Sequence, residues 1–205
     1  MEQEIEITYN VPDNYESDCL MNAVRSFSQL RGFTVTDETK SERRITYFDT
    51  TDLSAHSNGD TIRKVTGFED GRIRYDFKTG RNETRKEHNL WSQEDIPLGN
   101  LPIALHLPVA YSTISESARI SANYHKLHLQ SAHTELEISL DEIANSNETF
   151  RELEIEFKSG DVNHWWHLAN DVGSFARLQE VRIQKYSRIL GGRKWKKDLT
   201  NLWTH

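Results

Sequence analysis

The stretch that most constrains the fold is Arg151–Asp161, which reads Arg-Glu-Leu-Glu-Ile-Glu-Phe-Lys-Ser-Gly-Asp. In an extended chain alternate side chains share a face, so its three glutamates point one way and its three large apolar side chains point the other. The acidic set is Glu152, Glu154 and Glu156, and the apolar set is Leu153, Ile155 and Phe157. The stretch therefore predicts a β-strand with one apolar face and one strongly acidic face.

Two further stretches, residues 2–9 and 133–142, alternate in the same way. Their acidic faces carry Glu2, Glu4 and Glu6 in the first and Glu135, Glu137 and Asp141 in the second. A single strand of this kind is typical of the solvated face of an antiparallel sheet. Three such strands concentrate carboxylates, which repel one another unless a nearby cation balances their charge. Carboxylate oxygens are the ligands that Mg²⁺ or Mn²⁺ prefers.

Basic side chains alternate along a predicted meander of antiparallel strands between residues 61 and 91. Turns at Asp70-Gly71 and at Gly80-Arg81-Asn82 separate its strands. The second strand carries Arg72, Arg74, Asp76 and Lys78 on one face, and the third carries Arg85, Glu87 and Asn89. The sequence thus supplies a set of basic strands whose positive charges can balance the carboxylates of the acidic strands.

Amphipathic helices are expected at residues 13–31, and at residues 162–175 behind an N-cap at Asp161. If the charged strand faces met water, the apolar faces would fill one core and leave the helices little to bury. We therefore expect an α+β fold, an eight-stranded antiparallel β-barrel or tunnel with a charged lumen and a few helices covering it outside. Val181–Leu190 is expected as the last strand, so that 1–190 form one domain and 191–205 its C-terminal amphipathic helical tail.

Composition limits the classes of function. The 205 residues carry a formal net charge of −7, which argues against a protein that coats nucleic acid. The N-terminus lacks the basic start and apolar run of a secretory signal, and no segment is apolar over the length that spans a bilayer. We expect a cytoplasmic protein that binds neither nucleic acid nor membrane, with a homodimer as a further option.

The order of motifs resembles the CYTH family, also called triphosphate tunnel metalloenzymes. The family's opening Glu-x-Glu-x-Lys, its aromatic-Phe-Asp-Thr strand end and its Leu-Arg-x-Arg strand are matched by Glu4-Ile-Glu6-Ile-Thr8, Tyr47–Thr50 and Ile62-Arg63-Lys64-Val65. Later matches are Tyr75–Lys78, Arg85-Lys86-Glu87, Arg119, Leu140-Asp141, Glu154–Gly160 and Gln184-Lys185-Tyr186-Ser187-Arg188. The resemblance covers nearly the whole chain to Leu190, and it is closest to the inorganic triphosphatase and thiamine-triphosphatase types.

The resemblance implies a tunnel that binds a triphosphate with the help of Mg²⁺ or Mn²⁺ and hydrolyses a phosphoanhydride bond. The candidate metal ligands are Glu4, Glu6, Asp141, Glu154 and Glu156. The candidate phosphate-binding residues are Arg63, Lys78, Arg85, Arg119 and Lys185, since phosphate oxygens need Arg and Lys donors. The catalytic base is unassigned, with Glu6 and Glu87 as candidates.

The sequence also departs from the family pattern. Thr8 stands where the family has Lys, Val65 where it has a second Arg, and Gln184 where it has Ser. Lys64 alternates to the face opposite Arg63 and should not replace the missing cation. Two alternatives therefore stay open, a class-IV-type adenylyl cyclase that forms cyclic AMP from ATP and a weak or inactive module that only binds phosphate or polyphosphate. Substrate, metal preference and oligomeric state are not determined by the sequence.

Overall fold

A computed structural model describes residues 2–80, 84–144, 149–183 and 185–191, leaving aside the side chains of residues 2–4, 84 and 191. The strands are β1 (Glu2–Val11), β2 (Thr34–Asp49), β3 (Thr61–Thr66), β4 (Ile73–Thr79), β5 (Thr84–Ser92), β6 (Ser115–Gln130), β7 (Thr134–Ala144), β8 (Thr149–Gly160) and β9 (Gln179–Glu180). The α-helices are α1 (Ser17–Leu30), α2 (Ser54–Asn58), α3 (Leu101–Ala104), α4 (Val162–Phe175) and α5 (Lys185–Gly191). Short 3₁₀ helices cover Leu98–Asn100 and Val109–Tyr111.

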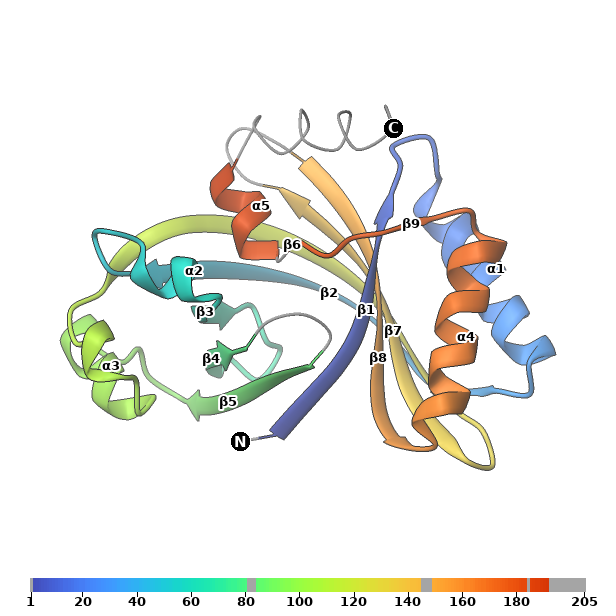
Figure 1. Ribbon diagram of the computed structural model, residues 1–205, viewed down its shortest axis with the longest axis horizontal. Coiled ribbons are helices and arrows are strands. Elements are labelled where there is room, and N and C mark those ends of the chain that lie inside the picture. The colour runs from blue at the N-terminus through green and yellow to red at the C-terminus, as the bar shows by residue number, and fades with distance from the viewer. Residues whose placement is uncertain (1, 81–83, 145–148, 184, 192–205) are drawn as a thin grey trace.

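All nine strands belong to one strongly curved antiparallel sheet, in the order β5-β4-β3-β2-β6-β7-β8-β1-β9 (Figure 1). Strand β5, at one end of this order, also pairs with β1, and there Glu2–Ile5 face Thr84–Glu87. Farther along the same edge of β1, Tyr9 and Asn10 pair with β9 instead. The expectation of an α+β antiparallel fold is confirmed. The expected eight-stranded barrel or tunnel is present only in part, because the sheet has nine strands and β1 and β5 join over four residue pairs only.

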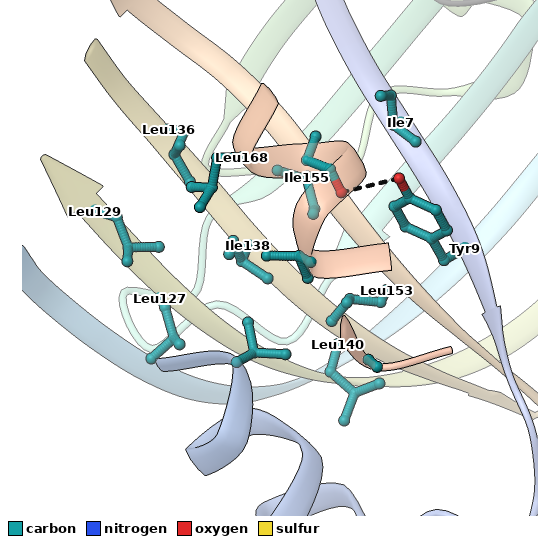
Figure 2. Close-up of a cluster of buried hydrophobic side chains, with 14 of the residues drawn as sticks. Ile7, Tyr9, Leu127, Leu129, Leu136, Ile138, Leu140, Leu153, Ile155 and Leu168 are labelled. Atoms are coloured by element: carbon teal, nitrogen blue, oxygen red, sulfur yellow. Dashed lines mark hydrogen bonds between the residues drawn. The ribbon is translucent and has the colours of Figure 1, made fainter. Parts of the chain in front are cut away.

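Helices α1 and α4 cover the apolar outer side of β1, β6, β7 and β8. Figure 2 shows how alternate residues of these strands, such as Ile138 and Ile155, point into one cluster with Leu168 of α4. The phenol of Tyr9 donates a hydrogen bond of 2.9 Å to the carbonyl of Ala169. A Cβ built on Gly173 would lie 2.4 Å from the Tyr9 ring, so only glycine permits this approach of α4 to β1. The apolar faces thus look outward to the helices, as the sequence predicted.

The charged faces of the same strands look inward, and one end of the interior is filled by apolar side chains. Tyr186 and Ile189 of α5 pack there against side chains from the strands, which include Ile45, Val65 and Ile120. The rings of Tyr47 and Tyr186 stack with centroids 4.8 Å apart. Helix α5 lies on the side of β1, β7 and β8 opposite to α1 and α4, and α2 and α3 lie at the far end of the molecule (Figure 1). The sheet therefore encloses a polar space that α5 blocks at one end.

The strand expected at Val181–Leu190 is wrong, because most of this segment is helix α5. Lys185 and Arg188, three residues apart, both approach the carboxylate of Glu152, while Tyr186 and Ile189, also three apart, enter the apolar cluster. This spacing of three residues is the periodicity of a helix. The predicted tail at 191–205 lies outside the described residues from position 192 onward.

The helix predicted at residues 162–175 is α4 with the same bounds, and the helix predicted at residues 13–31 is α1 with shorter bounds. Helix α4 begins behind Asp161, whose carboxylate accepts a hydrogen bond of 2.9 Å from the backbone N–H of Asn163, as expected of an N-cap. No helix in the described part of the chain combines the length and the apolar character that crossing a bilayer requires.

Candidate active site

The concave side of the sheet holds a cavity of about 680 Å³. Its basic lining consists of Arg43, Arg63, Arg74, Lys78, Arg85, Lys126, His128, Lys158, Arg182 and Lys185. Its acidic lining consists of Glu6, Glu87, Glu137, Asp141, Glu152, Glu154, Glu156 and Glu180. Most of the acidic residues come from β1, β7 and β8, and a basic group comes from β3, β4 and β5. The cavity therefore has an acidic wall and a basic wall.

The acidic wall is built in rows, because β1, β8 and β7 are neighbours in exact register. Glu156 faces Glu6 of β1 on one side and Glu137 of β7 on the other. One row farther along, Glu154 lies between Thr8 and Ser139. Side chains that face each other across antiparallel strands have Cβ atoms about 4.5–5.5 Å apart. The strand alternation seen in the sequence thus places several carboxylates at neighbouring positions of one surface.

Lys185 of α5 lies among the next carboxylates of this wall. Its ammonium nitrogen is 2.6 Å from Asp141 Oδ2, 2.9 Å from Glu154 Oε1 and 3.4 Å from Glu152 Oε2. Arg188 adds a second ion pair to Glu152. One short helix thus places two cations against three carboxylates.

Burial and the contacts with Lys185 shift the pKa values of these carboxylates in different directions. Burial raises the pKa of Asp141 and of Glu152 despite the nearby charge of Lys185. For Glu154 burial acts in the same direction, but the charge and hydrogen bond of Lys185 outweigh it and lower the pKa to about 2. Burial acts to lower the pKa of Lys185 itself, but the facing carboxylates, Asp141 first, raise it well above its ordinary value. Glu154 is therefore held ionised at neutral pH opposite a protonated lysine.

The basic wall is organised by Asp76 of β4, whose side chain is fully buried. Its carboxylate oxygens lie 2.6 Å from Arg63 Nε and 2.9 Å from Arg74 Nε. Burial alone would raise the pKa of Asp76, but the charges of Arg63 and Arg74 outweigh it and lower that pKa. One buried carboxylate thus fixes two guanidinium groups that line the cavity.

Lys78 and Arg85 complete this wall on β4 and β5. Lys78 Nζ is 3.4 Å from Glu87 Oε1, and Arg85 Nη2 donates to Thr61 Oγ1 at 3.1 Å. Glu87, a candidate base, therefore lies on the basic side of the cavity rather than on the acidic side. Glu6, the other candidate, lies on the acidic side opposite Glu156.

The structure brings most of the predicted site residues together around this cavity. They are Glu6, Arg63, Lys78, Arg85, Glu87, Asp141, Glu154, Glu156 and Lys185. Glu4 lies on β1, but its side chain is outside the part of the chain that the structure describes. Arg119 is placed elsewhere, since 66% of its side chain is exposed and it pairs with Glu116 at 2.6 Å. Its neighbour Ile120 is buried in the inner cluster, so alternation puts Arg119 on the outer face.

Sequence reasoning missed several cavity residues. Lys126 of β6 lines the cavity and lies 2.5 Å from Glu137, and Arg43 of β2 lines it as well. Strand alternation could have identified both residues. Lys126 is an even number of residues from Ile120, and Arg43 is an even number from Ile45, so each shares the inner face with a buried isoleucine.

The structure also shows which side chains lie near Val65 and Thr8, two of the three departures from the family pattern, whereas the third, Gln184, lies outside the described residues. Val65 is buried in the inner cluster and faces Arg74 across the β3–β4 pair, so a guanidinium is present beside the position of the missing one. Lys64 pairs with Asp95 at 2.5 Å and is absent from the cavity lining, which confirms that it does not replace that cation. Thr8 faces Glu154, the carboxylate that Lys185 contacts.

The donor set of the acidic wall consists of carboxylate oxygens, which are the ligands of Mg²⁺ and Mn²⁺. Within the described ranges, no three His, Cys, Asp or Glu side chains are gathered as they would be around a metal ion. Several carboxylates contact lysines instead, such as Glu156, which lies 2.7 Å from Lys158. The ligand chemistry fits a hard divalent cation, and loading it would require these ion pairs to rearrange.

The fold resembles that of several solved proteins. Protein PH1819 from Pyrococcus horikoshii superposes with a TM-score of 0.61 at 16% identity, over 93% of this chain and 99% of that one. A putative adenylate cyclase from Bacillus halodurans gives 0.59 at 15% identity, over 92% and 98%. The putative adenylyl cyclase HpAC1 from Hippeastrum, described as having a dominant triphosphatase activity, gives 0.60 at 11% identity, over 92% and 96%.

At these identities the likeness concerns the fold. No model of a known protein family matches the sequence, and no curated protein matches it. The chain shares the fold of these proteins, which agrees with the fold that the order of its motifs predicted.

Proposed function

We propose that this chain binds a triphosphate in its cavity and hydrolyses one of the phosphoanhydride bonds with the help of Mg²⁺ or Mn²⁺. The observation that carries the proposal is the division of one cavity of about 680 Å³ into a basic wall on β3, β4 and β5 and an acidic wall on β1, β7 and β8. A metal–triphosphate complex has matching needs, because its phosphate oxygens require cationic donors and its metal requires oxygen ligands.

The basic wall would bind and align the polyphosphate. Arg63 and Arg74 are fixed by Asp76, so their remaining N–H groups are presented to the cavity in a set orientation. Lys78 and Arg85 lie on the adjacent strands, and all four line the cavity. Fixed donors of this kind stabilise charge that develops in the transition state without reorganising at the moment of reaction.

The acidic wall would hold the metal through Glu6, Glu154 and Glu156, with Glu4 and Asp141 as further ligands. When bound, the metal supplies Lewis-acid polarisation of a phosphoryl oxygen and lowers the pKa of water. Among the protein groups, we propose Glu6 as the acceptor of the water proton, because Glu87 faces Lys78 on the basic side. Lys185 contacts carboxylates in this structure, so we assign it to holding the acidic wall together as well as to meeting phosphate.

Two related outcomes use the same site. The neighbours described as putative adenylate cyclases favour a second candidate, the formation of cyclic AMP from ATP. Thr8 and Val65, where the family has cations, motivate a module that only binds polyphosphate. The HpAC1 neighbour, with its dominant triphosphatase activity, supports hydrolysis as the first choice.

The test is to incubate the purified protein with inorganic triphosphate, thiamine triphosphate or ATP, each with Mg²⁺ or Mn²⁺, and to measure phosphate, pyrophosphate and cyclic AMP. Phosphate release that Glu156→Gln lowers on the order of 100-fold or more supports hydrolysis, since losing one charge-stabilising group commonly has that effect. Glu116→Gln, on the outer face beside Arg119, is the control and should leave the rate unchanged.

Cyclic AMP as the main product would favour the cyclase. Binding of triphosphate without turnover would leave only the binding module. A protein that neither binds nor converts any of the three compounds would contradict the whole proposal.

A further inference from the structure

The connection from β5 to β6 forms most of the longest run of this chain without Asp, Glu, Lys or Arg. The run covers residues 96–115, which we call the uncharged segment. Since 28% of the chain is charged, twenty residues would carry five or six charges on average. The segment includes α3, which lies at the opposite end of the molecule from α1 and α4 (Figure 1). None of its residues, all of which the structure describes, lines the cavity.

The inner side of the uncharged segment is packed firmly against the sheet. Leu101, Leu105 and Tyr111 are each no more than 2% exposed. All three belong to an apolar cluster that includes Phe77 of β4. The Tyr111 hydroxyl also donates a hydrogen bond of 2.7 Å to Asp60 Oδ2. The position of the segment on the sheet is therefore fixed.

The backbone of the uncharged segment is held in a set conformation. Three of the four prolines of the chain, Pro97, Pro102 and Pro108, lie in it. The carbonyl of each accepts a backbone hydrogen bond of 2.8 Å from a residue three to five positions farther on. Because proline also fixes φ at about −65°, the segment loses little conformational entropy when a partner covers it.

Large apolar side chains project from the outer side of the uncharged segment. Ile103 is 78% exposed, Val109 is 89% exposed and Leu98 is 39% exposed. A single exposed apolar side chain is ordinary on a protein surface. Here three of them lie on one short segment that carries no charged residue. Depletion of charged residues is typical of the core of a surface that another protein covers.

The net charge of the chain indicates which partner this surface suits. At a formal net charge of −7, two copies repel one another in most orientations. The uncharged segment lets two copies meet without placing like charges against each other. The exposed Leu30 of α1 offers no such surface, because the next residue, Arg31, forms an ion pair of 3.0 Å with Asp171 of α4. Covering that face would remove both charges from water, which costs free energy.

We infer that the uncharged segment is the interface between two copies of this chain, which meet end to end. A twofold pair brings the same patch of both copies together, and an uncharged apolar patch is complementary to itself. Standard interfaces use about 20–30 residues on each side, so a segment of this length gives a small interface. We expect a dissociation constant on the order of 1–100 µM for the dimer. The dimer does not depend on the proposed function.

The experiment measures the dissociation constant of the dimer by sedimentation velocity of the purified full chain over a range of concentrations. Ile103→Glu and Val109→Glu should each raise it at least about tenfold, because each places a charge twice in a symmetric apolar interface. Leu30→Glu is the matched control, since Leu30 is 85% exposed, and it should leave the constant unchanged. Added NaCl should strengthen the dimer, because it screens the repulsion between two negative copies.

Other results would overturn the inference. Dissociation by Leu30→Glu but not by Ile103→Glu would place the interface on α1 and α4. A dimer that weakens with added NaCl would have an interface built from ion pairs. A chain that stays monomeric at every concentration has no such interface, and its cosedimentation with phosphatidylcholine vesicles would assign the segment to a lipid surface instead. Circular dichroism checks the folding of each variant, and Val109→Glu carries the test if Ile103→Glu misfolds.

Discussion

Replacing Asp76 with Asn should destabilise the protein strongly, because it removes a buried negative charge that lies between two arginines. In the wild type, Asp76 is fully buried and lies 2.6 Å from Arg63 Nε, and the Arg63 side chain is only 13% exposed. Asn is nearly isosteric with Asp, so the change removes the charge while leaving no cavity. The variant therefore isolates the electrostatic contribution of one buried carboxylate to its two ion pairs, with Arg63 and Arg74.

The magnitude follows from which charges remain. Breaking a buried pair by removing one partner costs about 3–5 kcal/mol, since the other charge stays buried without compensation. The nearest other carboxylate to Arg63 is Glu87, at 4.0 Å, and Arg74 is 28% exposed. Both facts place the loss near the lower end, at about 3 kcal/mol. For a chain of this size that loss lowers the Tm by about 6–12 °C.

The assay is thermal and urea unfolding followed by circular dichroism, with Asp18→Asn as the control. Asp18 lies 2.6 Å from Lys40, the same separation as in the Asp76–Arg63 pair, but its side chain is 61% exposed. Exposed pairs contribute little, so this control should unfold close to the wild type. If Asp76→Asn loses no more stability than the control, water in the cavity already solvates the arginines and the argument from burial is wrong.

Two further predictions concern the cavity. Arg85→Ala should lower the rate of triphosphate hydrolysis at least about tenfold, because it removes a charge-assisted contact in the cavity. Arg119→Ala should leave that rate unchanged. Equal effects of the two substitutions would contradict the placement of Arg119 on the outer face. Glu154, whose pKa falls from its ordinary value of 4.5 to about 2, contributes stability that is complete above 4.5 and is lost as the pH falls through about 2. Urea unfolding between pH 5 and 2 should therefore show a shallower pH dependence for Glu154→Gln, and an identical pH dependence would refute the pairing with Lys185.

Strand alternation predicted which faces look inward, and the structure bears this out for the acidic strands. Glu154 and Glu156 line the cavity while Ile155 packs beneath α4, as Arg151–Asp161 implied. This part was predictable because a period of two residues fixes the side of every residue once one is known to be buried.

The missed features have local physical causes. The sequence predicts a strand from Arg43 to Thr50, whereas β2 begins at Thr34. Its first half, residues 34–42, reads Thr-Val-Thr-Asp-Glu-Thr-Lys-Ser-Glu and is polar on both faces, so it gives no hydrophobic period. The motif resemblance assigns Arg119 to the site, whereas strand alternation relative to the buried Ile120 places it on the outer face. For α5, the residues of Lys185–Arg188 suit either a strand or a helix, and the choice depends on carboxylates such as Asp141 that lie far away in sequence.

The position of β1 sets the order in which the chain can fold. Its partners are β8 and, at each end of its other edge, β5 and β9, so its longest pairing joins residues 5–11 to residues 151–157. At a synthesis rate of about 5–20 residues per second, β1 leaves the ribosome roughly 7–28 s before β8 does. Helix α4, whose Gly173 packs against Tyr9 of β1, is synthesised after β8, so its packing on β1 comes later still. The strand that carries the predicted metal ligands is thus made well before β8, and its edge toward β8 stays unpaired and open to wrong partners in the meantime.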